Sequence, residues 1–211
     1  MTAAYPPEPW YLGGSLLVSG FLVPVEHLPA LPKGRRPIVI GGRALVGAAF
    51  AHYVPGGALQ YDELLIAVPS LGRGGLRVTI PQIWVDSPAS QAGGRELWGI
   101  PKQLASFARV DDGSRARTEM RDDRGPVAAI RATYGLPLLP GMRQLSLPIL
   151  QQPEGRSILS HNRVIGRMSG LRASWTFSPT GPLAWLAGRR PLFNVAIRGA
   201  SIIFGMDVKR S

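Results

Sequence analysis

Glycine and proline interrupt this chain at short intervals from one end to the other. The 211 residues include 26 glycines and 20 prolines, and the apolar segments between them are short. Because both residues break helices and favour tight turns, this spacing is typical of many strands joined by turns rather than of long helices. We therefore expect a mostly β (α+β) fold in which antiparallel strands form a closed barrel or a sandwich around an apolar cavity, since closure removes exposed strand edges.

The expected strands are apolar segments separated by turn signals such as Gly56-Gly57 and Asp111-Asp112-Gly113. They cover residues 14–23, 44–54, 61–68, 76–85, 106–110, 115–121, 127–134 and 194–204. A long strand pair is expected around 156–177, after the pattern resumes beyond Pro140.

Two short helices are expected between these strands. The first covers 89–92, because Ser87 can cap it and Pro88 can occupy its first position. The second covers 182–187 and would end at Gly188.

The length of the chain corresponds to one domain with a sizeable core. No internal repeat, heptad pattern or low-complexity linker divides it, so we treat 1–211 as a single domain. The apolar run 16–25 contains Gly20 and Pro24 and is too short to cross a membrane. The chain has no cysteine and no Lys or Arg before Lys33, which predicts a cytoplasmic protein without a secretory signal.

The formal net charge of +11 could indicate a nucleic-acid partner. However, the basic residues are scattered without a run longer than two, and no nucleic-acid-binding motif accompanies them, so we expect neither a nucleic-acid nor a membrane partner. Amine chemistry has few candidates, because the only lysines are Lys33, Lys102 and Lys209. We also expect no metal, because the three histidines lack the spacing of a zinc site. These are His27, His52 and His161.

The most informative stretch is Gly-Arg-Glu-Leu-Trp-Gly-Ile-Pro-Lys-Gln-Leu-Ala at 94–105, which places Lys102 among apolar neighbours. Those neighbours are Trp98, Ile100 and Leu104, and Pro101 fixes the backbone just before the lysine. Desolvation would lower the pKa of the lysine from about 10.4 and expose a free amine. Such an amine can attack a ketone to give an iminium, which accepts electrons from a breaking bond without any cofactor. The alternative is that Lys102 extends its ammonium to solvent, as most lysines do.

This segment resembles the motif of the acetoacetate decarboxylase-like family, in which Gly-Arg-Glu is followed by a short spacer, Pro-Lys and Leu. Upstream, Tyr61-Asp62-Glu63 is similar to the family's Tyr-x-Glu, whose carboxylate faces the reactive lysine. The similarity continues more weakly through Trp175 and Pro191-Leu192. It implies that Lys102 forms a Schiff base and that Glu63 is its acid/base or positioning partner. A solvated carboxylate at a strand edge is the alternative for Glu63.

The resemblance also implies a set of substrate-binding residues. They are Tyr61, Arg95, Glu96, Trp98 and Gln103. Arg95 could receive a substrate carboxylate or pair structurally, and Glu96 could be catalytic or hold the loop through an arginine. Tyr61 and Trp98 are expected as cavity wall or core.

Two positions depart from the family pattern. Decarboxylases of the family have a second lysine after the Schiff-base lysine, where this chain has Gln103. Their N-terminal arginine, which helps to receive the substrate carboxylate, falls near Ser15. Both losses weaken recognition of a small keto acid. They also leave burial to supply more of the expected fall in the pKa of Lys102.

The sequence therefore predicts a cofactor-independent, Schiff-base-forming lyase that acts on a keto acid or a related carbonyl substrate through Lys102. Decarboxylation and aldol condensation with dehydration both remain open, because members of the wider family without the decarboxylase residues keep the lysine for aldol chemistry. The alternative is a non-catalytic protein that binds a small molecule on the same fold, with Lys102 as a simple cation. The resemblance also implies a homo-oligomer.

Overall fold

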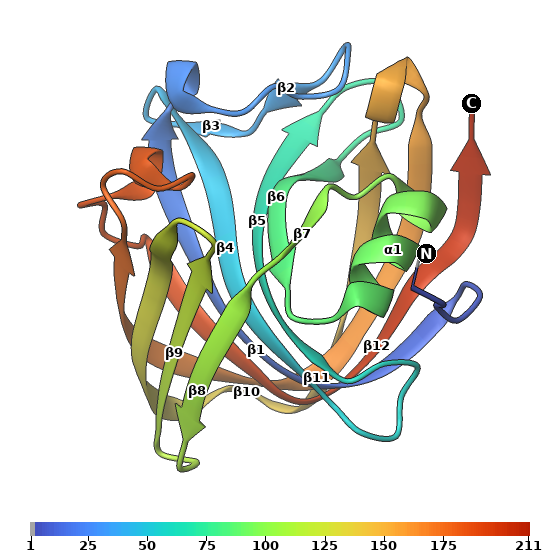
Figure 1. Ribbon diagram of the computed structural model, residues 1–211. Coiled ribbons are helices and arrows are strands. Elements are labelled where there is room, and N and C mark those ends of the chain that lie inside the picture. The colour runs from blue at the N-terminus through green and yellow to red at the C-terminus, as the bar shows by residue number, and fades with distance from the viewer. Residues whose placement is uncertain (1–2) are drawn as a thin grey trace.

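The computed structural model describes residues 3–211, which form one large mixed sheet and a single α-helix (Figure 1). The strands are β1 (Trp10–Pro24), β2 (Arg36–Pro37), β3 (Val39–Ile40), β4 (Arg43–Val54), β5 (Tyr61–Leu71), β6 (Arg77–Val85), β7 (Lys102–Leu104), β8 (Ser106–Asp111), β9 (Arg115–Asp122), β10 (Gly125–Gln151), β11 (Ile158–Phe177) and β12 (Phe193–Arg210). The helices are α1 (Pro88–Trp98) and three 3-10 turns, η1 (Val25–His27), η2 (Pro153–Gly155) and η3 (Ala184–Leu186).

The main sheet runs in the order β7-β6-β5-β4-β1-β12-β11-β10-β9-β8 and is strongly curved. Its strand pairs are antiparallel except for β6 with β7 and β6 with β10. The second of these parallel pairs joins Val78 to Ile149, so strands far apart in the sheet order meet again. The expected mostly β (α+β) fold is confirmed, and the curved sheet fits the expected sandwich or barrel-like arrangement.

The central strands bury side chains on both faces, which accounts for their nearly continuous apolar sequence. In β4, Val46, Ala48 and Phe50 belong to one apolar cluster, which also contains Phe21. Tyr53, on the opposite face, belongs to a second apolar cluster. The sheet therefore separates two cores, and the second of them lies beside α1.

The helix α1 begins where the sequence predicts it and extends further. Ser87 is its N-cap and accepts a hydrogen bond from the backbone N–H of Ser90 (3.2 Å), with Pro88 in the first turn. The helix continues past the expected end at residue 92 to Trp98, and Gly99 ends it in the left-handed conformation (φ 63°).

The prediction of a helix at 182–187 is wrong. The segment contains only the 3-10 turn η3, in which Ala187 N–H donates to the carbonyl of Ala184 three residues earlier. Pro182 and Gly188 leave too few residues between them for α-helical bonds to propagate.

The strand pair expected around 156–177 is also wrong, because this stretch is one strand, β11, paired with β10 and β12. Gly166 and Gly170 both lie inside this extended strand. The partner strand β10 extends beyond the strand expected at 127–134 and continues through Pro137 and Pro140 to Gln151. Prolines are tolerated there because this part of β10 pairs on one side only, with β11.

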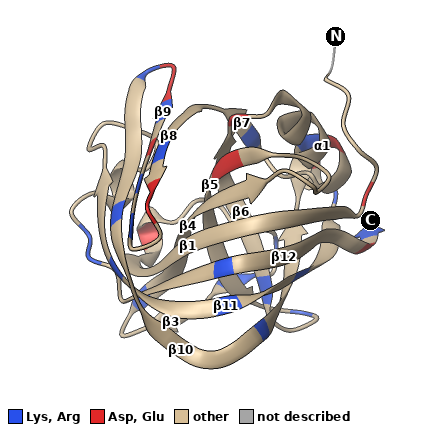
Figure 2. Cartoon of the chain, turned by 90° about the horizontal axis from the view of Figure 1, so that it is seen from below, with Lys and Arg blue, Asp and Glu red and all other residues tan. Residues whose placement is uncertain are grey.

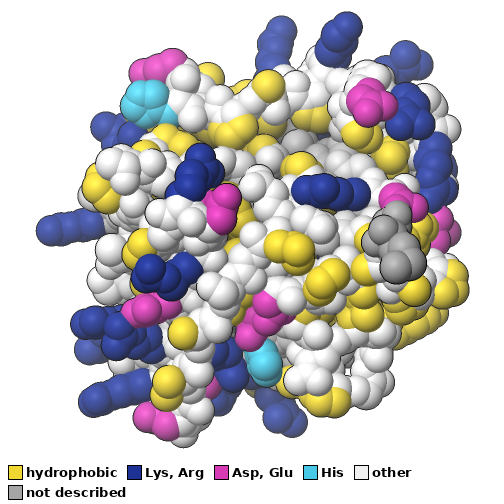
Figure 3. Space-filling model, in the orientation of Figure 1, with side chains coloured by type: hydrophobic (Ala, Val, Ile, Leu, Met, Phe, Trp, Pro, Cys, Tyr) yellow, Lys and Arg dark blue, Asp and Glu magenta, His cyan; other side chains and the backbone are white. Residues whose placement is uncertain are grey.

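Basic residues are spread over several strands and loops rather than gathered in one patch (Figure 2). In the space-filling view they project along the upper and left edges of the face that carries α1, whereas its lower right carries apolar side chains (Figure 3). This distribution agrees with the scattered pattern in the sequence. Within residues 3–211, no helix has the length and apolar character needed to cross a membrane.

Candidate active site

Lys102 is buried at the start of β7, with 3% of its surface exposed. Its Nζ donates hydrogen bonds to Ser90 Oγ (2.8 Å), Glu63 Oε2 (2.9 Å) and Tyr61 OH (3.4 Å). All three ammonium protons therefore have an acceptor. The side chain does not extend to solvent.

Glu63 lies inside the molecule on β5 and is 4% exposed. One carboxylate oxygen accepts from Lys102, and the other accepts from the hydroxyl of Tyr53 at 3.2 Å. Tyr53 reaches it because β4 and β5 pair directly, with Tyr53 opposite Tyr61. Glu63 is therefore a paired, buried carboxylate and not a solvated group at a strand edge.

The protonation of Lys102 differs from the sequence-based expectation of a lowered pKa. Burial lowers the pKa of Lys102, but the nearby Glu63 carboxylate and Tyr61 outweigh it, so the pKa is raised above 10.5. Burial also raises the pKa of Tyr61 to about 12, although the Lys102 charge opposes this shift. The resting site therefore holds an ammonium beside a carboxylate and two neutral phenols. The amine becomes nucleophilic only when a proton leaves it.

An apolar cavity of about 100 Å³ opens beside this pair. Tyr61 and Trp98 line it, as the sequence analysis expected. The remaining lining residues are Trp10, Leu16, Tyr53, Glu63, Leu65, Ala67, Val78, Ile80, Ile83, Ile100, Lys102, Leu147, Ile149, Asn162, Val164 and Phe204. The cavity belongs to the second of the two cores.

The other three residues expected to bind substrate lie outside the cavity and are exposed. Arg95 Nε donates to the backbone carbonyl of Lys102 at 2.7 Å, so its guanidinium anchors β7. Glu96 accepts from the hydroxyl of Tyr5 at 2.6 Å. Gln103 follows Lys102 in a strand, and consecutive strand residues face opposite sides. The structure therefore does not bring Arg95, Glu96 or Gln103 to the cavity.

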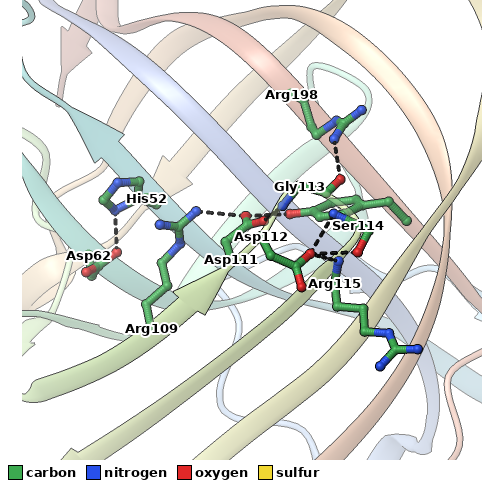
Figure 4. Close-up of polar contacts among 10 residues, drawn as sticks. His52, Asp62, Arg109, Asp111, Asp112, Gly113, Ser114, Arg115 and Arg198 are labelled. Carbon is green, nitrogen blue, oxygen red and sulfur yellow. Dashed lines mark hydrogen bonds and ion pairs between the residues drawn. The ribbon is translucent and has the colours of Figure 1, made fainter.

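The position near Ser15, where the resemblance places an arginine, also faces away from the cavity. Ser15 lines a small polar depression together with His52 and Asp62, on the other face of the sheet, whereas its neighbour Leu16 lines the cavity. His52 Nδ1 lies 2.8 Å from Asp62 Oδ1, and Arg109 and Tyr134 both donate to Asp111 (Figure 4). The first contact joins β4 to β5, and the contact of Tyr134 with Asp111 joins β10 to the end of β8.

Gly94 explains why the motif begins with glycine. A Cβ at this position would lie 2.6 Å from Cδ and 2.8 Å from Cε of Lys102, much closer than any real contact. The preceding Gly93 similarly admits the ring of Trp10. Helix α1 can therefore pack directly on the lysine side chain, and Ser90, one turn before Gly94, can reach Nζ.

Replacing Gly94 with Ala is expected to displace the Lys102 side chain and slow its reaction with a ketone by about 100-fold, since a misplacement of about 1 Å has that effect. Alanine favours a helix interior over glycine, so the loss would not come from helix instability. The rate of borohydride trapping with butanone measures the effect. Gly170→Ala is the matched control, because its added Cβ meets only ordinary contacts. Equal trapping rates for both variants would contradict this packing argument.

Replacing Lys102 with Met is expected to destabilise the fold by about 3–5 kcal/mol, because it leaves the Glu63 carboxylate buried without its partner. The double variant Lys102→Met/Glu63→Gln should recover most of this loss, and urea unfolding at pH 7 measures both. The raised pKa of Lys102 adds a pH effect. The contribution of the Lys102 ammonium to the stability of the wild-type fold is complete below pH 10.5 and decreases as the pH rises through the folded-state pKa. A double variant no more stable than Lys102→Met would contradict a coupled pair.

Two residues of this site were not identified from the sequence. Ser90 carried a usable signal, since it lies one helical turn before Gly94 behind the capping residue Ser87. Tyr53 carried none, because its contact with Glu63 depends on the pairing register of β4 with β5.

Comparisons with known proteins agree with this fold. The family described as acetoacetate decarboxylase (ADC) matches residues 5–165. No curated protein sequence matches the chain. Among solved structures, acetoacetate decarboxylase from Legionella pneumophila subsp. pneumophila str. Philadelphia 1 is 16% identical, with a TM-score of 0.74 over 99% of this chain and 89% of that one.

Two further structures share the fold at similarly low identity. An acetoacetate decarboxylase-like enzyme from Sphingomonas wittichii RW1 is 14% identical, with a TM-score of 0.65 over 98% of this chain and 94% of that one. The enduracididine biosynthesis enzyme MppR, complexed with the condensation product of pyruvate and imidazole 4-carboxaldehyde, is 18% identical, with a TM-score of 0.67 over 97% of this chain and 90% of that one. The family match covers most of the chain, and the chain therefore belongs to the acetoacetate decarboxylase family.

Proposed function

We propose that this protein is a Schiff-base-forming lyase of a keto acid or a related carbonyl compound, with Lys102 as the amine and Glu63 as the group that moves protons. The observation that carries the proposal is the buried Lys102–Glu63 pair, 2.9 Å apart, at the wall of an apolar cavity. Membership of the acetoacetate decarboxylase family supports the same chemistry. A buried ion pair beside a cavity is a typical setting for a catalytic group.

The first step would form an iminium. Lys102 Nζ passes a proton to Glu63 Oε2, and the neutral amine then attacks the carbonyl carbon of the substrate. The new C–N bond forms as the C=O π bond breaks, and one amine proton moves to the oxygen. Glu63 returns its proton to the resulting hydroxyl, which leaves as water. The iminium remains next to the restored carboxylate, and its one N–H lies near Ser90 Oγ and Tyr61 OH.

The iminium can react further in two ways. A 3-keto acid would lose carbon dioxide as the electrons of the carbon–carbon bond move into the iminium, which leaves an enamine that is protonated on carbon. Alternatively, Glu63 would remove an α-proton, and the enamine would attack an aldehyde and form a new carbon–carbon bond before loss of water. The condensation product bound to MppR belongs to the second type of reaction. Hydrolysis then returns the lysine.

The competing function is non-catalytic binding of a small molecule in the same cavity. It receives some support from the pKa of Lys102, which is raised so that the group rests as a cation. Three assays separate the two functions. Acetoacetate would be tested for release of carbon dioxide, pyruvate with an aldehyde for an aldol product, and butanone for exchange of its α-hydrogens. We expect turnover of at least one substrate that disappears in Lys102→Met. Turnover unchanged by that variant would exclude covalent catalysis, and binding without turnover would favour the competing function.

Assembly into a homo-oligomer is part of the proposal, with the second half of β10 as the contact surface between copies. Residues 135–149 contain one charged side chain, Arg143, and leave large apolar side chains exposed, including Leu136 at 85%. Two copies of this segment would meet with little repulsion between like charges, so the apolar surface suits a contact with a second copy of itself. Light scattering should give a multiple of the monomer mass that falls after Leu136→Asp. A monomer at all concentrations would contradict this part of the proposal.

A further inference from the structure

The walls of the cavity determine what charge a substrate can carry into it. Of the cavity-lining residues in the described part of the chain, Lys102 is the only basic one and Glu63 the only acidic one, and they neutralise each other. Most other walls are aliphatic or aromatic. Apart from the Lys102–Glu63 pair, a substrate therefore meets an uncharged and mostly apolar wall.

Asn162 and Tyr53 are polar wall groups that are already engaged, and the other two, Tyr61 OH and the unpartnered Trp98 Nε1, carry no charge. The side-chain N–H groups of Asn162 donate to the carbonyls of Leu147 (3.0 Å) and Ser160 (3.3 Å) and to Ser160 Oγ (3.2 Å). Its Oδ1 accepts from the backbone N–H of Gly205 at 2.7 Å. Tyr53 donates its hydroxyl proton to Glu63. Neither Asn162 nor Tyr53 is free to receive a carboxylate.

Cations that could receive a carboxylate lie elsewhere. Arg95 is bound to the backbone of Lys102 from outside, and Gln103, in place of a second lysine, is exposed. Leu16 stands on the cavity wall where β1 could have presented a basic side chain. A substrate carboxylate would therefore be buried beside Glu63 without a counter-ion of its own, which is strongly unfavourable.

An uncharged carbonyl compound fits the charge balance of the reaction. In the resting site the Lys102 cation is neutralised by Glu63, and in the iminium the same carboxylate neutralises the new cation. The net charge of the cavity thus stays at zero from the free site to the intermediate. A keto acid would add one uncompensated negative charge at both stages.

From these observations, and resting on the proposed Schiff-base function, we infer that the cavity selects a small, uncharged, apolar ketone or aldehyde and rejects keto acids. The cavity volume of about 100 Å³ is well below the roughly 300–1,000 Å³ of pockets for drug-sized ligands, so the substrate is small.

An uncharged substrate also decides between the two reaction types. Without a carboxylate there is no carbon dioxide to lose, so the reaction is aldol addition or its reverse. In the forward direction Glu63 takes the α-proton of the iminium, and the enamine carbon bonds to the carbonyl carbon of a second aldehyde. The alkoxide so formed takes that proton, and water releases the product from Lys102. No oxidant or reductant is required.

Pairs of similar size that differ in charge test this inference. 2,4-Pentanedione is compared with acetoacetate, and butanone with pyruvate, by the concentration that gives half-maximal borohydride trapping on intact protein. For each pair, the half-maximal concentration of the acid is divided by that of the neutral compound. This ratio is then divided by the same ratio measured with free Nα-acetyl-lysine amide, which removes differences in intrinsic reactivity. We expect the neutral member of each pair to be favoured by about 100-fold or more. Peptide mapping should place both adducts on Lys102.

The outcomes distinguish this inference from the proposed function. Trapping on Lys102 with equal or better use of the acids would overturn the neutral-substrate inference and leave the Schiff-base function intact. Absence of any adduct on Lys102 would overturn both. Leu16→Arg provides a second measurement, because a cation on the wall should reduce the ratio toward one if its absence causes the preference. An unchanged ratio in a folded Leu16→Arg protein would contradict that cause.

Discussion

Lys102→Met is expected to abolish the exchange of butanone α-hydrogens with deuterium in D₂O, by at least about 1,000-fold. This exchange requires only the iminium and the enamine, so it reports on the reactive nitrogen even when the natural second substrate is unknown. Methionine keeps the length and apolar character of the side chain while removing the amine. Proton NMR of the ketone measures the rate directly.

The other two lysines provide the controls for this variant. Lys33 and Lys209 are both exposed, and neither lines the cavity, so Lys33→Met and Lys209→Met should exchange at the wild-type rate. Because loss of Lys102 also leaves a buried carboxylate, Lys102→Met/Glu63→Gln should be measured beside it for folding by circular dichroism. Exchange that persists in a folded Lys102→Met protein would exclude Lys102 as the reactive group.

Glu63→Gln is expected to separate imine formation from turnover. Without the carboxylate, butanone exchange should fall by about 100- to 10,000-fold, because no base remains to take the α-proton. Borohydride trapping should persist, since the amine is still present. Glu154→Gln, an exposed glutamate on η2, is the control and should change neither rate.

The pH dependence of trapping should shift in a direction that the site determines. In the wild type, Glu63 and Tyr61 raise the pKa of Lys102, so trapping increases as the pH rises toward and through that raised value. In Glu63→Gln, burial still lowers the pKa of the amine while the main opposing charge is gone. The profile should therefore move to lower pH. A shift to higher pH, or full exchange activity in this variant, would contradict the proposed role of Glu63.

The sequence was sufficient for the fold class and for most strands, because turns at glycine and proline separate apolar segments that become buried strands. It failed where those residues occur inside strands. Pro137 and Pro140 lie in β10, and Gly166 and Gly170 lie in β11. In both strands the identity of the neighbour decides whether a glycine or proline breaks the strand, and pairing between distant segments is not visible in one sequence.

The residues of the candidate site were likewise predicted only in part. Lys102 and Glu63, separated by 39 residues, were identified from short motifs and lie in contact. Arg95 and Glu96 share the same motif but lie on the outer side of α1, and helix phase alone decides this. The raised pKa of Lys102 could not be anticipated, because it depends on whether the charge of Glu63, together with Tyr61, outweighs burial once the fold brings them to the nitrogen.

The most direct test of the account is the intact mass of the protein after borohydride reduction with butanone, followed by peptide mapping. The account predicts one reduced adduct per chain, located on the peptide that contains Lys102, and none in Lys102→Met. With only three lysines the position of the adduct is unambiguous. A folded protein that forms no adduct, or forms adducts on Lys33 and Lys209 alone, would contradict the claim that Lys102 is a Schiff-base-forming amine.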